Sequence, residues 1–185
     1  MNKAFFLDRD GVVNKELDYV YRKDDFYFID GVFEACQTIL SHGYEIILIT
    51  NQSGIARGYY SEEDFLKLTK WMVKIFMENG VTISDVMYCP HHATEGLGVY
   101  KVNCECRKPK TGLLVQIRNA LKQDLQGAYM VGDSLKDLQA AKAVGITPIL
   151  VRTGNGLQTL QELSTAGLEN VEVFNDLASF VDHIL

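Results

Sequence analysis

Short apolar runs alternate with amphipathic stretches along the whole chain, and this alternation constrains the fold more than any other feature of the sequence. The apolar runs have the length of buried strands. In the stretches between them, apolar residues recur every three or four positions, as on one face of a helix. Strands that alternate with helices through short connections favour a parallel sheet covered by helices on both faces. We therefore predict an α/β fold with a doubly wound, Rossmann-like parallel sheet.

The predicted strands and helices follow one another without a repeat or a low-complexity linker. Strands are expected at residues 4–7, 45–50, 86–88, 128–131, 147–151 and 171–174. Helices are expected near residues 32–40, at 61–77, 112–122, 135–144 and 157–166, and from residue 176 onward. Ser61, with Asp64 three residues later, is expected to cap its helix. Cys36 and Trp71 lie in helical patterns and are expected to pack in the core.

Length and charge narrow the class of protein. At roughly 150 residues per domain, a chain of 185 residues is expected to form a single domain over 1–185. Eighteen Lys and Arg against 24 Asp and Glu give a net charge of −6, which weighs against a nucleic-acid partner. No apolar run approaches the ~20 residues of a membrane span, and the first residues lack a signal peptide's apolar core. We expect a cytoplasmic monomer with no membrane partner.

Polar residues follow three of the predicted strands at the point where each strand ends. They are Asp8-Arg9-Asp10-Gly11, Thr50-Asn51-Gln52-Ser53-Gly54, and Gly132-Asp133 with Asp137 one helical turn later. In an open parallel sheet, ligands bind beyond the carboxyl ends of the strands. We therefore expect these three groups, which are distant in sequence, to meet at one edge of the sheet.

The residue types in this set suit phosphoryl transfer. Asp8 and Asp10 can share a hard cation, and Asp133 would complete an oxygen-rich site of the kind that Mg²⁺ prefers. One carboxylate can then attack phosphorus, and the other can protonate the leaving oxygen. Thr50 and Lys108 are candidates for holding the transferring phosphoryl oxygens. A lone Asp-x-Asp is more often a turn or a helix cap, so the hypothesis depends on the whole set.

Three of the four cysteines lie close together in the segment after the strand at 86–88. Cys89, Cys104 and Cys106, together with one histidine, offer the four ligands of a closed, structural Zn²⁺ site. Reduced thiols beside unrelated histidines are the alternative. The spacing alone leaves open whether His91 or His92 is the fourth ligand. We predict a zinc-binding loop over residues 89–106.

Four segments of the chain together resemble the motifs of the haloacid dehalogenase superfamily. They are residues 6–11, 49–54, 107–109, and 131–133 with Asp137. Over nearly its whole length, the chain is similar to a branch that contains phosphatases of heptose 1,7-bisphosphate and of histidinol phosphate. The resemblance implies a Mg²⁺-dependent phosphoric monoester hydrolase that works through an aspartyl-phosphate. It also implies the zinc loop, with ligands that match Cys89, His91, Cys104 and Cys106.

Roles carry over to individual residues only through this resemblance. It implies that Asp8 is the nucleophile and that Asp10 is the general acid and base, with its main-chain carbonyl on the metal. Asp133 would also bind Mg²⁺, and the phosphoryl group would be held by Thr50 and Lys108. Substrate contacts would come from Glu16, Tyr19, Asn51, Gln52, Ser53 and Arg107. Ser134 departs from relatives that carry a lysine there, and Asp137 is expected to orient Lys108.

The spacing of the motifs also bears on the substrate. Residues 11–49 leave no room for a cap domain, so we expect an uncapped site whose specificity comes from loops. Arg57, Arg107 and Arg152 are candidates to receive a second phosphate, which favours removal of the 7-phosphate of heptose 1,7-bisphosphate over histidinol phosphate as substrate. A DNA 3′-phosphatase is disfavoured by the acidic charge.

Two further readings come from other classes of protein. A dinucleotide site at Gly154-Asn155-Gly156 fails because Thr159 replaces the third glycine, so a turn is expected there. A non-enzymatic zinc-binding module remains an alternative, and it would not need Asp8 and Asp10 together. A phosphatase assay with Mg²⁺ separates this module from an enzyme.

Overall fold

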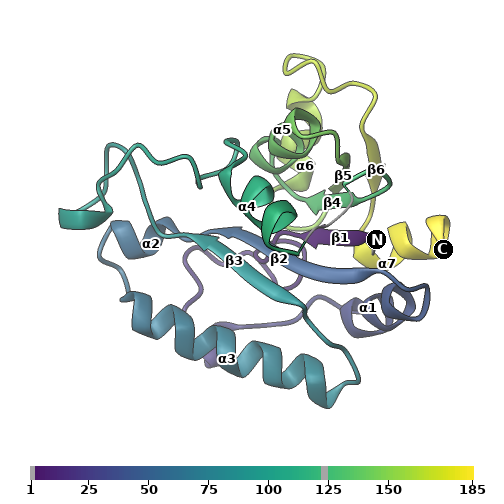
Figure 1. Cartoon of the computed structure of the whole chain (residues 1–185), viewed down its shortest axis with the longest axis horizontal. Helices are drawn as coiled ribbons and strands as arrows, with labels where there is room; N and C mark the ends of the chain where they lie inside the picture. The colour runs from purple at the N-terminus through teal and green to yellow at the C-terminus, as the bar shows by residue number, and fades with distance from the viewer. Residues whose placement is uncertain (1–2, 122–124) are drawn as a thin grey trace.

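Six parallel strands form one sheet at the centre of the computed structural model, which describes residues 3–121 and 125–185 (Figure 1). Their spatial order is β3 (Asp85–Cys89), β2 (Glu45–Asn51), β1 (Ala4–Leu7), β4 (Tyr129–Gly132), β5 (Thr147–Val151) and β6 (Glu172–Phe174). The chain starts in the middle of the sheet, runs outward to β3, crosses back to β4 and continues to β6. This order is that of a doubly wound sheet, and it confirms the predicted fold class.

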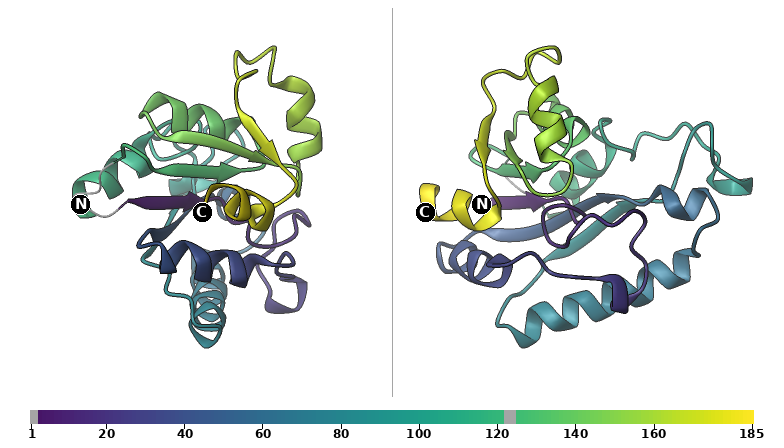
Figure 2. Two further views of the ribbon diagram at one scale, coloured as in Figure 1. Left: turned by 90° about the vertical axis from the view of Figure 1, so that its right-hand side faces the viewer. Right: turned by 180° about the vertical axis from the view of Figure 1, so that it is seen from behind.

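Helices cover both faces of the sheet (Figure 2). One face carries α1 (Val32–Ser41), α3 (Glu62–Glu78) and α7 (Leu177–Ile184). The other carries α4 (Gly112–Leu121), α5 (Leu135–Ala143) and α6 (Gly156–Glu162). Because the central strands are covered on both sides, consecutive positions rather than alternate ones are apolar, as in residues 46–49 of β2, which are all fully buried.

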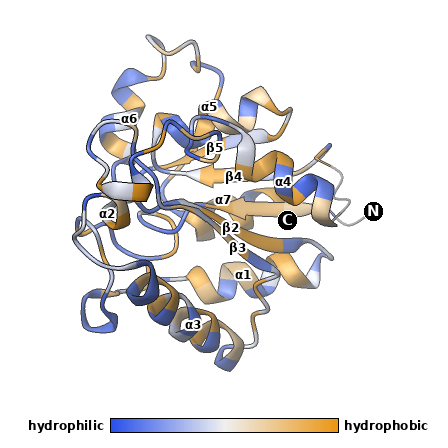
Figure 3. Ribbon diagram, turned by 60° about the vertical axis from the view of Figure 1, so that its left-hand side comes forward, coloured by the Kyte–Doolittle hydropathy of each residue, from blue (hydrophilic) through white to orange (hydrophobic). Residues whose placement is uncertain are grey.

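The core follows the two faces of the central strands. In β1, Phe5 and Leu7 pack toward α1 and α7, whereas Ala4 and Phe6 pack toward α4 and α5. All four side chains are fully buried. Figure 3 shows the same result as a concentration of hydrophobic residues on the strands. Trp71 joins the first face through Phe26, with ring centroids 5.6 Å apart, and Cys36 is buried there, as predicted.

Local signals place the helix ends close to the predicted positions. Ser61 caps α3, since its Oγ accepts from the Asp64 N–H at 3.0 Å and the Asp64 carboxylate accepts from the Ser61 N–H. The structure adds α2 (Ser53–Ala56), which the sequence did not predict. Helix α6 is shorter than the predicted 157–166, because the chain turns after Glu162 and reaches a positive φ of 68° at Gly167. The predicted end of the 112–122 helix at residue 122 lies outside the described residues.

Strand register brings the polar strand ends together. Leu7, the last residue of β1, pairs with Leu48 of β2 on one side and Val131 of β4 on the other. The residues that follow these positions therefore emerge side by side at the carboxyl edge of the sheet. Between β1 and β2 the chain forms only a loop, the 3₁₀ turn η1 (Lys23–Asp25) and α1. No cap domain is therefore inserted between these two strands to cover this edge. Within the described residues, none of the helices combines the length and the hydrophobicity that crossing a bilayer requires.

Burial in the central strands predicts where stability resides. Leu48 is fully buried in β2, whereas Leu157 on α6 is 61% exposed. We expect Leu48→Ala to lower the free energy of unfolding by about 2–5 kcal/mol, because it leaves a cavity in a packed core. The matched change Leu157→Ala is expected to stay within about 0.5 kcal/mol. Urea unfolding followed by circular dichroism measures both, and equal effects would contradict this account of the core.

Candidate active site

Three carboxylates and one ammonium group meet at the carboxyl edge of the sheet. Asp8 follows β1, Asp133 follows β4, and Asp137 lies in the first turn of α5. One oxygen from each carboxylate lies within 4.8 Å of the others. Lys108 reaches this acidic cluster from the loop before α4, with its Nζ 3.0 Å from Asp8 Oδ1 and 2.6 Å from Asp137 Oδ1. The predicted contact between Asp137 and Lys108 is present.

The acidic cluster carries more negative charge than its one cation balances. Burial and the neighbouring Asp137 raise the pKa of Asp8 well above its usual range, although Lys108 opposes this. Burial and Asp137 also raise the pKa of Asp133 to about 7, against hydrogen bonding from the Asn155 N–H. Burial alone lowers the pKa of Lys108, yet Asp137 and Asp8 outweigh it and raise that pKa. The arrangement of oxygen donors therefore suits an additional hard cation.

A turn after β5 holds Asp133 in place. Asp133 Oδ2 accepts from the Asn155 main-chain N–H at 2.8 Å and from its Nδ2 at 3.2 Å. Thr153 Oγ1 donates to the Gly11 carbonyl at 2.6 Å, which ties the same turn to the loop after β1. Gly154 has a φ of 57°, and a Cβ at this position would collide with Asp133 Oδ2. The predicted turn at 154–156 therefore fixes the Asp133 carboxylate by hydrogen bonding and close packing.

The Asp10 side chain faces a different set of donors. Its carboxylate accepts from Arg9 Nε at 3.0 Å and Nη2 at 2.8 Å, and Arg9 itself is almost completely buried. Asn14 Nδ2 and Gln52 Nε2 donate to the same carboxylate at 3.0 and 3.1 Å. Asp10 is thus outside the group of three carboxylates described above. A role in binding a cation stays a prediction that rests on its main-chain carbonyl.

Two adjoining cavities open at this edge. The inner cavity, about 110 Å³, is lined by the acidic cluster, Thr50 and Lys108. The outer cavity, about 260 Å³, is lined by most of the predicted substrate residues, namely Glu16, Tyr19, Asn51, Gln52, Ser53 and Arg107. Both cavities share Asp10, Glu16, Asn51, Lys136 and Asn155. One elongated ligand can therefore place one end at the acidic cluster and the other in the outer cavity.

The residues that line the two cavities differ in part from those expected from the sequence. Arg57 does not line either cavity, because its guanidinium forms an ion pair with Glu95 and lies 5.9 Å from the Tyr19 ring centroid. Arg152 donates to Asn175 at 2.8 Å and also lies outside both cavities. Lys136, which the sequence analysis missed, lines both. Its position three residues after Asp133, in the first turn of a helix that starts at this edge, was the available signal.

Asn51 fixes the position of Lys108. The Asn51 Nδ2 donates to the Lys108 carbonyl at 3.0 Å, and its Oδ1 accepts from the Lys108 main-chain N–H at 3.0 Å. This pair of bonds attaches the loop after Cys106 to the end of β2. The Lys108 Nζ also donates to the Ile49 carbonyl at 2.6 Å. Asn51 thus supports the cation of the acidic cluster as well as lining the cavities.

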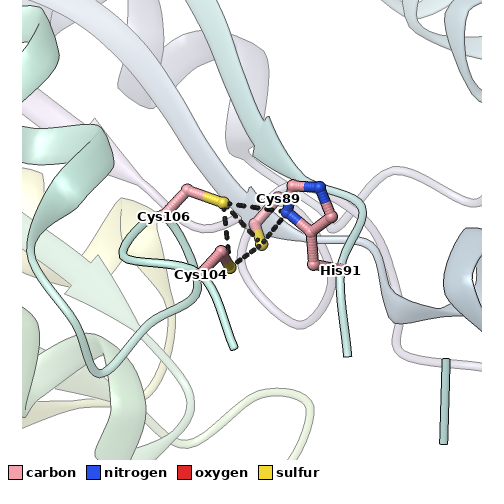
Figure 4. Close-up of side chains that lie close together, drawn as sticks. All are labelled: Cys89, His91, Cys104 and Cys106. Carbon is pink, nitrogen blue, oxygen red and sulfur yellow. Dashed lines mark hydrogen bonds between the residues drawn. The ribbon is translucent and has the colours of Figure 1, made fainter. Parts of the chain in front are cut away.

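The predicted zinc ligands converge on one point (Figure 4). The three thiols lie 2.9–3.5 Å from one another, and His91 Nδ1 lies 3.8 Å from Cys89 Sγ and 3.3 Å from Cys106 Sγ. Four donors in tetrahedral contact with one Zn²⁺, at about 2.3 Å for sulfur, have similar separations. His92 points elsewhere and contacts Arg57 and Glu95. Of the two candidate histidines, His91 and not His92 lies beside the three thiols.

Comparison with known proteins identifies the family. A model of the HAD-hydrolase-like family matches residues 105–180. The D-glycero-beta-D-manno-heptose-1,7-bisphosphate 7-phosphatase of Vibrio cholerae is 49% identical over 170 residues, which cover 91% of each chain. The chain belongs to the heptose-bisphosphate phosphatase family. It is therefore a haloacid dehalogenase-type phosphoric monoester hydrolase, as the motifs predicted, and the reading as a non-enzymatic zinc module is wrong.

Further members of the heptose-bisphosphate phosphatase family agree in sequence and in fold. The Escherichia coli enzyme of the same name is 44% identical over 152 residues, or 82% of this chain and 80% of that protein. The crystal structure of the D,D-heptose 1.7-bisphosphate phosphatase from B. bronchiseptica, complexed with magnesium and phosphate, superposes with a TM-score of 0.87 at 35% identity. It covers 98% of this chain, and this chain covers 97% of it.

The raised pKa of Asp133 predicts a pH-dependent stability. A carboxyl whose pKa rises from 3.8 to about 7 on folding contributes stability that is fully present below pH 3.8, is lost progressively as the pH rises, and is gone above about pH 7. We expect Asp133→Asn, measured without added magnesium, to exceed wild type in free energy of unfolding by up to about 4 kcal/mol at pH 8. At pH 4, close to the pKa of the unfolded state, the two should be nearly equal. A pH-independent difference in urea unfolding would contradict this view of the acidic cluster.

Proposed function

We propose that this phosphatase removes the 7-phosphate of D-glycero-D-manno-heptose 1,7-bisphosphate through an aspartyl-phosphate on Asp8. The observation that carries the proposal is the meeting of Asp8, Lys108 and Thr50 in the inner cavity, beside Asp133. A nucleophilic carboxylate, a cation and a hydroxyl donor are what phosphoryl transfer needs around phosphorus. The names of the relatives support the choice of the heptose substrate.

The contacts support a role for each group in the inner cavity. Asp8 Oδ1 accepts from Lys108 Nζ and from the Arg9 N–H at 2.8 Å, which fixes the carboxylate and leaves Oδ2 for attack on phosphorus. The phosphorus–oxygen bond to the sugar then breaks, and Asp10 donates a proton to the leaving oxygen. In the second step Asp10 accepts a proton from the water that attacks the aspartyl-phosphate, and phosphate leaves. Lys108 and Thr50 hold the transferring phosphoryl oxygens throughout.

We propose Mg²⁺ as the cation of this site. The cluster of Asp8, Asp133 and Asp137 supplies hard oxygen donors, and Asn155 orients Asp133 within it. Asp8 and Asp133 are the proposed ligands, together with the main-chain carbonyl of Asp10. When bound, Mg²⁺ would screen the carboxylates from the incoming phosphate dianion. The related B. bronchiseptica structure, described as a complex with magnesium and phosphate, supports this assignment.

We propose that Cys89, His91, Cys104 and Cys106 bind structural Zn²⁺. Four protein ligands leave no open position, which suits a structural rather than a catalytic site. Arg107 and Lys108 follow Cys106 directly in the chain, and Arg107 Nη1 approaches the His91 carbonyl at 3.4 Å. The metal would therefore hold two cations over the cavities.

The outer cavity supports a bisphosphate as the substrate. Arg107 and Lys136 both line it, and they offer two positive charges for the phosphate that is not transferred. Glu16 and Tyr19 line the same cavity and are proposed to contact the sugar. Histidinol phosphate, the alternative substrate, carries only one phosphate and would leave these two cations without an anionic partner.

The wider setting of the protein is also inferred. The continuous six-stranded sheet supports a single domain over residues 1–185. Three reduced thiols held close together as a metal site suit a reducing compartment, so we place the protein in the cytoplasm. We infer that it acts as a monomer on a small phosphorylated sugar.

A phosphate-release assay tests the proposed reaction. With Mg²⁺ present, wild type should release phosphate from heptose 1,7-bisphosphate in strong preference to histidinol phosphate. Asp8→Asn should lower kcat by roughly a thousandfold or more, because the nucleophile is lost. Asp182→Asn, an exposed change on α7, is the matched control and should leave kcat unchanged. Preference for histidinol phosphate would overturn the substrate, and full activity of Asp8→Asn would overturn the mechanism.

Loss of a zinc ligand should affect binding more than chemistry. We expect folded Cys104→Ser to lose zinc and to raise KM by about tenfold or more, because Arg107 and Lys108 lose their support. Cys36→Ala, which removes a thiol from the core, should keep its zinc. Metal analysis and steady-state kinetics measure both variants. Unchanged kcat/KM in a zinc-free Cys104→Ser would show that the metal does not position these cations.

A further inference from the structure

A buried glutamine connects two residues of the proposed mechanism. Gln52 is 3% exposed, and its Nε2 donates to Thr50 Oγ1 at 2.9 Å and to Asp10 Oδ2 at 3.1 Å. One amide group therefore touches both the hydroxyl proposed to hold the phosphoryl group and the carboxylate proposed to move protons. Gln52 was expected only to contact the substrate, whereas these two bonds link it to the side chains on which the chemistry depends.

The direction of these hydrogen bonds follows from the chemistry of the groups. Both carboxylate oxygens of Asp10 already accept hydrogen bonds from the Arg9 guanidinium, so the amide nitrogen of Gln52, and not its oxygen, faces Asp10. The same nitrogen donates to Thr50 Oγ1, which uses the hydroxyl oxygen as an acceptor. Among the described residues, no other hydrogen-bond partner of this hydroxyl is found, so its hydrogen remains available to the inner cavity. A hydroxyl in this state can donate to a phosphoryl oxygen.

Tyr60 anchors the Gln52 amide in the orientation that Asp10 requires. Its hydroxyl donates to Gln52 Oε1 at 2.6 Å. If the amide were reversed, Oε1 would face the Asp10 carboxylate and repel it, and the Tyr60 hydroxyl would have to accept from the amide nitrogen instead of donating. Burial raises the pKa of Tyr60, so its hydroxyl keeps the proton that this bond requires.

Packing fixes the Tyr60 ring. Tyr60 is 6% exposed and stacks on Tyr21, with ring centroids 5.1 Å apart and planes 9° from parallel. Ile55 and Phe65 complete a small hydrophobic cluster around the ring. Gly54 lets the ring approach the turn after β2, since a Cβ there would collide with the Tyr60 ring. Because the ring is held by this packing, the Tyr60 hydroxyl has a fixed position next to Gln52.

We propose that Tyr60 is a positioning residue of the phosphatase. Through the orientation of Gln52, it directs the Thr50 hydroxyl hydrogen toward the transferring phosphoryl group and holds the Asp10 carboxylate in place. The inference rests on the proposed function only in taking the inner cavity as the site of the phosphoryl group. Tyr60 lines the outer cavity but not the inner one, from which Gln52 separates it, so its effect on the phosphoryl site passes through Gln52.

Tyr60→Phe tests the proposal, because it removes the hydroxyl and keeps the stacked ring. The probe is orthovanadate, which mimics the transferring phosphoryl group, added to the zinc-loaded full chain with saturating Mg²⁺. We expect Tyr60→Phe to weaken orthovanadate affinity by roughly tenfold and to lower kcat by a similar factor, with KM little changed. The matched control is Tyr88→Phe, which removes a hydroxyl bonded to Glu62 at 2.7 Å, outside the cavities. It should change neither quantity.

A double-mutant cycle separates positioning from a general structural effect. If Tyr60 acts through Gln52, adding Tyr60→Phe to a Gln52→Met variant should cause no further loss of orthovanadate affinity. Additive losses, equal losses in Tyr88→Phe, or wild-type affinity in Tyr60→Phe would each overturn the proposal. So would failure of the wild-type protein to bind orthovanadate.

The probe also separates this inference from the proposed substrate. Orthovanadate reports on the phosphoryl site whatever sugar the enzyme accepts. If wild type releases no phosphate from heptose 1,7-bisphosphate while Tyr60→Phe still weakens orthovanadate binding with no change in Tyr88→Phe, the substrate proposal fails and the role of Tyr60 stands. The converse result, activity on the bisphosphate with unchanged affinity in Tyr60→Phe, retains the function and rejects the positioning role.

Discussion

The buried ion pairs of Lys108 are the interaction on which the rest of the site depends. Its ammonium group, 2% exposed, lies between Asp8 and Asp137 and provides the positive charge that lets these carboxylates remain close together out of water. Lys108 lies on no strand, so its position has to be imposed by neighbours. Asn51 binds its main chain from the end of β2, and the Cys/His cluster closes the loop that precedes it.

Because the position of Lys108 depends on the cysteine loop, this loop and the acidic cluster form one structural unit. The loop leaves β3 at Cys89 and returns at Cys106. A further contact binds its outer part to the body of the protein. Tyr100 donates to the carboxylate of Glu62 at the start of α3 at 2.8 Å. The loop thus ends next to Arg107 and Lys108, which line the outer and the inner cavity respectively.

The sequence predicted the fold and the centre of the site because both follow from local rules. Apolar runs set the strands, the topology sets which strand ends meet, and Asp8, Thr50 and Asp133 lie at those ends. What it did not predict depends on where loops lie in space. Arg57 was placed by its charge, but its Glu95 partner comes from a distant loop. The links of Gln52 to Tyr60 and of Asn155 to Asp133 likewise join side chains through turns, which hydrophobic periodicity does not describe.

The short connection between β1 and β2 has a consequence for the kind of reaction the site supports. Enzymes that pass a phosphoryl group from one organic acceptor to another must keep water away from the reactive intermediate, commonly with a domain that closes over it. Here residues 8–44 form only a loop, a single 3₁₀ turn and one helix beside the open edge of the sheet. An aspartyl-phosphate at Asp8 would be in ready reach of solvent, so water is its natural acceptor and each turnover ends in irreversible hydrolysis.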